Sequence, residues 1–207
     1  PLIQELSGHA TWILWTHGRF DRRDVRASGL QLEKVDQSTP EFLTVDDLLG
    51  ARFGQKGPDL VVLLACVSGL VDVAANDELA GLSTALLQAG SRGVISALWS
   101  VDENATTLLA AKLSEFLAQG LPGSFALTSA QEWLRGATGA DLKTYIEERQ
   151  HVSGRSVTTE KAYSLLLEAF ELNLTERPYA NPYYWGAFVF AGSDRPGGIR
   201  PSEGAPH

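Results

Sequence analysis

The longest apolar run in the chain, Leu60–Val67, is the segment that most constrains its fold. It is far shorter than the roughly 20 residues that a membrane-spanning helix needs. Its first part, Leu60–Ala65, lacks the alternation of a half-buried strand, and Gly57-Pro58 marks a turn before it. The run therefore predicts a strand that is buried on both faces, as in a parallel sheet covered by helices.

Predicted strands and helices alternate along the rest of the chain. The strands are expected at Thr11–Thr16, Gly29–Leu32, Leu60–Ala65, Gly93–Leu98 and Tyr184–Ala191. Apolar residues at helical spacing predict helices at Thr44–Phe53, Asp77–Ala89, Asp102–Gln119, Ser124–Arg135 and Glu160–Leu174, with an exposed loop at Glu147–Thr159. This alternation predicts an α/β fold in which helices lie on both faces of a mostly parallel central sheet.

Composition and charge restrict the class of partner. Hydrophobic residues make up 44% of the 207 residues and charged residues 20%, as in a globular protein. The formal net charge of -8 argues against nucleic acid and membrane as partners, because both attract clustered Lys and Arg. A single cysteine allows no internal disulfide, so a reducing compartment, the cytoplasm, is expected.

The length fits one domain, which we place at residues 1–192. Residues 193–207 contain three prolines and three glycines and predict a flexible tail. The chain has no methionine and begins at Pro1, so we expect it to be part of a longer protein. The upstream part is expected to hold a sensor, a partner-binding region or a missing portion of this fold.

Two reactive side chains follow two of the predicted strands. His17 comes directly after Thr11–Thr16, and Cys66 comes directly after Leu60–Ala65. Catalytic groups gather beyond the carboxyl ends of the strands in a parallel sheet. If the two strands are neighbours, the imidazole and the thiol lie side by side. Taken alone, each residue is explained by an ordinary structural role, such as that of a small buried cysteine. The two motifs together are what predict a catalytic pair.

The pair suits nucleophilic attack on a carbonyl. A free cysteine thiol has a pKa of about 8.5 and reacts as the thiolate, so it needs a base beside it. An imidazole takes that proton and later donates one to the leaving amine. The backbone N–H groups of Gly18 and Cys66 are the expected donors to the oxyanion. The sequence has no metal-site spacing, phosphate-binding loop or dinucleotide fingerprint, so we expect neither a metal nor a cofactor.

Several short segments, in order along nearly the whole chain, resemble motifs of the CHAT family, a caspase-like domain related to separase. They are Thr16–Gly18, Leu63–Gly69, Asp77–Leu82, Gly90–Glu103 and Asn181–Gly192. The 49 positions from His17 to Cys66 are similar to the spacing in caspases. Val67 and Ser68 replace the Glu-Thr that is usual in the family. The resemblance implies a caspase-like three-layer sandwich.

The resemblance also implies a cysteine endopeptidase that makes limited, regulated cuts in a protein partner, in bacterial defence or cell-death signalling. It implies an activating or regulatory protein, and a sheet edge that another strand completes. The segment after the third buried strand is expected to form a wall of the pocket for the residue before the cut, where a carboxylate suits a cationic side chain. The expected substrate-binding residues are Trp99, Asp102, Glu103 and Ser68.

The sequence is also compatible with functions that need no peptidase and with simpler roles for these residues. The fold could serve as a catalytically silent scaffold or protein-binding module, or it could hydrolyse small acyl compounds. Asp102 and Glu103 could simply begin the next helix, because carboxylates favour the positive end of a helix. Ser68 could form part of a turn, and Trp99 could pack in the core.

Overall fold

The computed structural model describes residues 10–19, 21, 23–32, 41–50, 57–64, 76–100, 102–150 and 174–194. At its centre is a four-stranded sheet in the order β1-β5-β6-β7. The strands are β1 (Thr11–Leu14), β5 (Leu60–Leu63), β6 (Gly93–Ala97) and β7 (Phe188–Gly192). The first three are parallel, and β7 runs antiparallel to β6. The mostly parallel central sheet predicted from the sequence is confirmed.

A smaller antiparallel sheet follows β1 in the chain. Its strands, in the order β2-β3-β4, are β2 (Gly18–Arg19), β3 (Gly29–Leu32) and β4 (Glu41–Thr44). Gly29 leaves no room for a side chain, because a Cβ atom there would lie 2.5 Å from the carbonyl oxygen of Leu43. The sequence predicts β3 but neither of its partners, since β2 has two residues and β4 runs directly into a helix.

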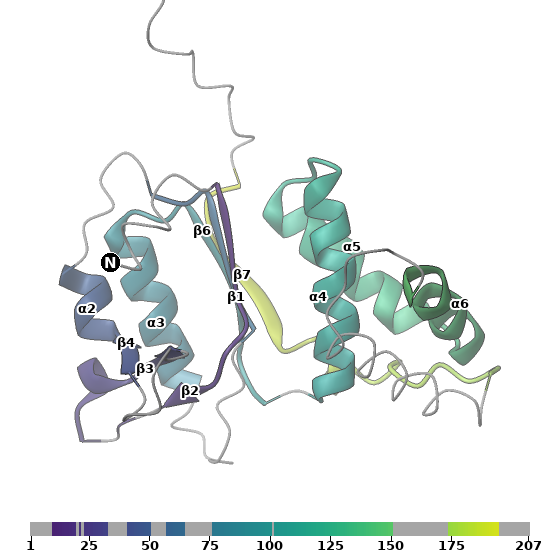
Figure 1. Cartoon of the computed structure of the whole chain (residues 1–207), viewed down its shortest axis with the longest axis horizontal. Coiled ribbons are helices and arrows are strands. Elements are labelled where there is room, and N and C mark those ends of the chain that lie inside the picture. Colours follow the sequence, from purple (N-terminus) through teal and green to yellow (C-terminus); the bar gives the residue numbers. More distant parts are fainter. Residues whose placement is uncertain are drawn as a thin grey trace, which may run out of the picture.

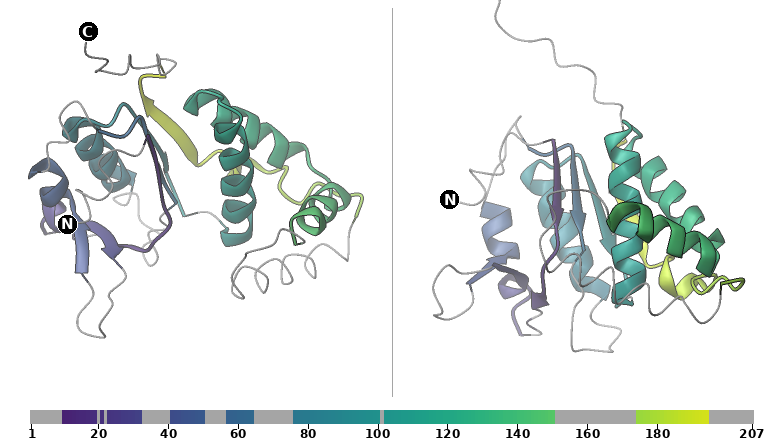
Figure 2. Two further views of the ribbon diagram at one scale, coloured as in Figure 1. Left: turned by 45° about the horizontal axis from the view of Figure 1, so that its top comes forward. Right: turned by 45° about the vertical axis from the view of Figure 1, so that its right-hand side comes forward.

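Helices cover both faces of the central sheet (Figure 1). α2 (Val45–Gly50) and α3 (Asn76–Ala89) lie on one side, and α4 (Glu103–Ala118) and α5 (Gly123–Gly136) lie on the other. α6 (Gly139–Gln150) lies beside α4 and α5, farther from the sheet. Both views in Figure 2 show the same layers. No helix among the described residues is long and apolar enough to cross a bilayer.

The central strand β5 buries all of its residues. Leu60 and Val62 belong to an apolar core that includes α4 and α5, whereas Val61 and Leu63 belong to a second core that includes α2 and α3. Alternate side chains of a strand point to opposite faces, so a strand between two cores must be apolar throughout. The strand buried on both faces that this run predicts is confirmed, and so is the three-layer sandwich that the family resemblance implied.

Some predicted segments lie wholly or largely outside the described residues. The helix predicted from Thr44 is described as far as Gly50. Thr44 caps it, because the Thr44 hydroxyl accepts a hydrogen bond from the N–H of Asp47 at 3.1 Å. The predicted helix at Glu160–Leu174 is undescribed except for its last residue, and the predicted tail is undescribed from residue 195 onward.

The end of α6 at Gln150 corrects the predicted start of the loop at Glu147. Residues 147–150 belong to this helix, whereas the sequence predicts an exposed loop over Glu147–Thr159. Thr138 and Asp141 form a capping pair at its start: the N–H of Asp141 donates to the Thr138 hydroxyl at 3.2 Å, and the N–H of Thr138 donates to the carboxylate at 2.9 Å. Residues 151–159, the rest of the predicted loop, lie outside the described residues.

Glu115 of α4 explains why the last turn of α6 is polar. Its carboxylate accepts hydrogen bonds from the Tyr145 hydroxyl at 2.8 Å and from Arg149 Nε at 2.6 Å, and it pairs with Lys112 at 3.1 Å. Burial by itself would raise the pKa of Glu115, but the bonds from Tyr145, Lys112 and Arg149 outweigh it and lower that pKa. Polar residues that look solvent-exposed in the sequence thus join α6 to α4.

The last strand also differs from its prediction. β7 begins at Phe188 rather than at Tyr184, because the preceding residues Pro182–Tyr184 form a short 3₁₀ helix, η4. The Asn181 side chain caps this turn by accepting a hydrogen bond from the N–H of Tyr183 at 2.9 Å. Asparagine followed by proline favours such a turn.

The first residues of the predicted tail are held in the fold. The N–H of Ser193 donates to the carbonyl oxygen of Arg92 at 2.9 Å, and the Asp194 carboxylate accepts a hydrogen bond from the N–H of Ser124 at 2.7 Å. Ser124 lies in the first turn of α5, whose cap residue, Pro122, makes no side-chain cap. Asp194 therefore satisfies a helix-end donor from a distant part of the chain.

A glutamine side chain fixes the segment between η4 and β7. Gln131 of α5 donates through Nε2 to the carbonyl oxygens of Trp185 and Phe188, both at 2.9 Å. These bonds cross more than 50 positions of sequence, and they join the helical layer to the turn that precedes the edge strand.

We expect Gln131→Ala to lower the free energy of unfolding by about 1–3 kcal/mol, because two carbonyl groups lose their donor. Urea denaturation followed by circular dichroism measures this change. Glu132→Ala, at the exposed neighbouring position of α5, is the control and should change the free energy by less than about 0.5 kcal/mol. Equal urea midpoints for Gln131→Ala and Glu132→Ala would show that Gln131 does not hold the segment before β7.

Candidate active site

β1 and β5 are hydrogen-bonded neighbours in the central sheet. They run parallel, with Thr11 paired to Leu60 and Leu14 paired to Leu63. The N–H of Leu64 donates to the carbonyl oxygen of Leu14 at 2.9 Å, directly past the last pair. The two strands therefore end at the same level of the sheet, and the adjacency on which the predicted catalytic pair depends is present.

Cys66 and Ser68 follow β5 and lie outside the described residues. The register of the sheet still relates Cys66 to other site residues by position in sequence. Each β1 residue pairs with the β5 residue 49 positions later, which is also the interval from His17 to Cys66. Each paired β5 residue meets the β6 residue 33 positions later, which is the interval from Cys66 to Trp99. His17, Cys66 and Trp99 thus hold equivalent sequence positions after three adjacent parallel strands.

His17 lies where the chain passes from the central sheet to the smaller one. Its carbonyl oxygen accepts a hydrogen bond from the N–H of Gln31 at 2.8 Å, and the neighbouring Thr16 hydroxyl donates to the Gln31 carbonyl oxygen. The His17 side chain is exposed, and within the described part of the chain no hydrogen bond or ion pair engages it. The backbone is therefore fixed while the imidazole stays accessible to a thiol or a substrate.

Gly18 keeps its backbone N–H away from the smaller sheet. Gly18 is paired with Leu30, and the bond from Gln31 to His17 flanks this pair. In an antiparallel ladder, such flanking bonds mark a pair whose own N–H and C=O groups point away from the partner strand. Among the residues that the structure describes, the N–H of Gly18 therefore has no acceptor in the smaller sheet, and its role as an oxyanion donor stays a prediction.

Trp99 and Tyr183 connect the loop after β6 to η4. The indole Nε1 of Trp99 donates to the carbonyl oxygen of Tyr183 at 3.1 Å. The Tyr183 hydroxyl donates in return to the carbonyl oxygen of Ser100 at 3.0 Å. Sequence reasoning missed Tyr183, and the Asn181-Pro182 turn beside it was the available signal.

Asp102 is the cap of α4. Its carboxylate accepts a hydrogen bond from the N–H of Ala105 at 2.9 Å, and the Thr106 hydroxyl donates to its carbonyl oxygen at 2.9 Å. Glu103 begins the helix, and both carboxylates are exposed. Burial raises the pKa of Tyr179, and the charge of Asp102 raises it further. The helix-start role that the sequence left open is therefore present, and a substrate role for these carboxylates stays a prediction.

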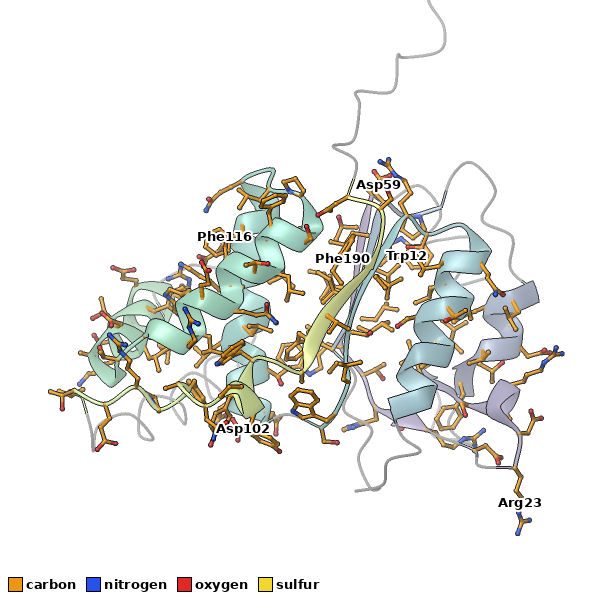
Figure 3. The ribbon with its side chains drawn as sticks, turned by 180° about the vertical axis from the view of Figure 1, so that it is seen from behind. Trp12, Arg23, Asp59, Asp102, Phe116 and Phe190 are labelled. Atoms are coloured by element: carbon orange, nitrogen blue, oxygen red, sulfur yellow. The ribbon has the colours of Figure 1, made fainter. Side chains whose placement is uncertain are left out.

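Two hollows lie away from these residues. One, of about 510 Å³, is between α5 and α6, beside Trp133 and Tyr145. The other, of about 280 Å³, lies at the amino end of the sheet beside the ion pair of Asp59 and Arg92. In Figure 3, Asp59 lies near the top of the molecule and Asp102 near its bottom. Neither hollow is lined by a predicted site residue, and no group of His, Cys, Asp and Glu side chains in the described ranges is arranged to hold a metal ion.

Comparison with known proteins bears on this arrangement. The family model described as the CHAT domain matches residues 3–193, which is nearly the whole chain. No curated protein matches the chain. The parallel central sheet with helices on both faces agrees with the caspase-like sandwich that the motifs implied. The chain therefore belongs to the CHAT-domain family and has its caspase-like α/β fold.

Proposed function

We propose that this protein is a cysteine endopeptidase that makes limited, regulated cuts in a protein partner, with Cys66 as nucleophile and His17 as general acid and base. The observation that carries the proposal is the parallel pairing of β1 with β5. A histidine and a cysteine at equal distances past two neighbouring parallel strands are expected at the same edge of a sheet, where catalytic groups gather.

The chemistry proceeds in two steps. His17 takes the proton of the Cys66 thiol, and the thiolate attacks the carbonyl carbon of the scissile peptide bond. The oxyanion accepts hydrogen bonds from the N–H groups of Gly18 and Cys66, and the amine leaves with a proton from His17 while a thioester forms. Water then attacks the thioester with His17 as base, which releases the acid product and restores the thiol.

The pocket for the residue before the cut is proposed to lie along the loop after β6. Trp99 supplies an aromatic wall, Asp102 and Glu103 supply negative charge, and Ser68 is the fourth residue proposed to contact the substrate. An exposed indole beside exposed carboxylates attracts a cationic side chain through cation–π and ionic interactions. We therefore propose arginine or lysine before the scissile bond.

Control by another protein is part of the proposal. We propose that an activating or regulatory protein, or an upstream sensor region, turns the peptidase on, as membership of the family suggests. The partners proposed are proteins rather than nucleic acid or membrane, in agreement with the net charge of -8. Bacterial defence or cell death, in the cytoplasm, is the proposed setting.

Cys66→Ala tests the nucleophile. We expect it to reduce cleavage by roughly 10⁴-fold or more, because removal of a catalytic nucleophile leaves only residual catalysis. The measurement compares new protein N-termini in a cell lysate treated with wild-type protein or with Cys66→Ala, by mass spectrometry. Circular dichroism should show the same fold for both. Identical cuts by the two proteins would exclude the proposed nucleophile, and a lack of new N-termini in both lysates would favour a silent scaffold.

Asp102→Asn separates the charge of this residue from its capping role. Asparagine is an equally good helix cap, so we expect Asp102→Asn to leave the free energy of unfolding unchanged. Asp102→Ala should lower the free energy of unfolding by about 1 kcal/mol. With fluorogenic peptides, Asp102→Asn should reduce kcat/KM about tenfold for arginine before the cut and leave a leucine peptide unaffected. Wild-type kinetics on the arginine peptide would show that Asp102 serves the helix alone.

A further inference from the structure

Tyr183 takes part in a reciprocal clamp between η4 and the loop after β6. The Tyr183 hydroxyl donates to the carbonyl oxygen of Ser100 at 3.0 Å, and Trp99 Nε1 donates to the carbonyl oxygen of Tyr183 at 3.1 Å. Each segment therefore supplies one side-chain donor and one backbone acceptor. The two segments are more than 80 positions apart in sequence, so the clamp is a tertiary contact.

The η4 side of this clamp is firmly held. The N–H of Tyr183 donates to the Asn181 side chain at 2.9 Å, and its ring meets the Tyr184 ring edge-on at 5.4 Å between centroids. Tyr184 packs against the core on the α4 side of the sheet, and Gln131 bonds to Trp185 directly after it. Tyr183 is thus attached to a part of the fold that packing and hydrogen bonds already fix.

The loop on the other side of the clamp carries the proposed pocket wall. Ser100, whose carbonyl oxygen accepts the Tyr183 hydroxyl, is next to Trp99 and two positions before Asp102. β6 before this loop is buried on both faces, and α4 after it starts at Glu103. The loop joins these fixed elements while Trp99 itself is 37% exposed, so its conformation depends on contacts such as the clamp.

We propose that Tyr183 is a positioning residue, which holds the loop of Trp99 and Asp102 in the conformation that receives the substrate side chain before the cut. For its effect on cleavage, this inference rests on the proposed peptidase function. The hydroxyl bonds to the loop rather than to the core, so its removal affects the loop and leaves the ring contact with Tyr184 in place.

Tyr183→Phe deletes only the hydroxyl, and Tyr184→Phe is the matched control. The Tyr184 hydroxyl makes no hydrogen bond within the described ranges, and its residue lies next in the chain. Hydrogen–deuterium exchange of a fragment spanning residues 97–104 reports on the loop without requiring activity. We expect Tyr183→Phe to raise exchange in this fragment about three- to tenfold, the equivalent of one net hydrogen bond, and Tyr184→Phe to leave it unchanged.

Kinetics supply the readout that a purely structural role would not change. With the fluorogenic arginine peptide, Tyr183→Phe should raise KM about three- to tenfold and leave kcat within about twofold of wild type. Alkylation of Cys66 by iodoacetamide, which needs no pocket, should keep its wild-type rate. Trp99→Phe removes the reciprocal bond and should raise exchange in the same fragment.

The outcomes separate this inference from the proposed function. Unchanged exchange in Tyr183→Phe overturns the clamp, whatever the activity of the wild-type protein. Raised exchange with unchanged KM, or with equal losses of kcat and of Cys66 alkylation, overturns the positioning role. Raised exchange in Tyr183→Phe, alongside a wild-type protein that cleaves no peptide even when cell lysate is added as a source of the activator, supports the clamp and contradicts the peptidase proposal instead.

Discussion

The parallel ladder between β1 and β5 is the constraint on which the candidate site depends. β5 is buried on both faces, so a shift of its register by one residue would exchange Leu60 and Val62 with Val61 and Leu63 between two cores. β1 is held in turn by Trp12, which is 2% exposed in the core on the α3 side. Packing thus fixes where both strands end, and those ends determine where the residues after them begin.

Elements with strong periodic patterns could be predicted from the sequence. The apolar run of β5 specified a strand between two layers of helices, and helical spacing located α3, α4 and α5 within a few residues. The misses have local causes. β2 is too short to show a pattern, the last turn of α6 is polar because Arg149 reaches Glu115, and η4 replaces the start of the predicted last strand. Pattern analysis detects burial, and these segments depend instead on individual hydrogen bonds.

The candidate site divides in the same way. Its proposed catalytic residues follow two strands that could be located from the sequence, although their adjacency comes from the structure, whereas the loop of Trp99 depends on a contact with a distant segment. Tyr183 bonds to Ser100 in this loop, and Gln131 bonds to Trp185 near Tyr183; both bonds join residues more than 50 positions apart. The Asn181-Pro182 pair indicates a turn beside Tyr183, but no local pattern indicates which distant residues these side chains reach. The two parts suit different tasks, because a rigid sheet edge fixes reacting groups and a loop adapts specificity.

The central claim is that the imidazole of His17 and the thiol of Cys66 share one crevice and exchange a proton. The pH dependence of Cys66 alkylation measures this most directly, because the chain has a single cysteine. The account predicts a midpoint well below the free-thiol pKa of about 8.5 in the wild type, and a return to about 8.5 in His17→Ala. The same midpoint in the wild type and in His17→Ala would contradict the claim that His17 and Cys66 exchange a proton.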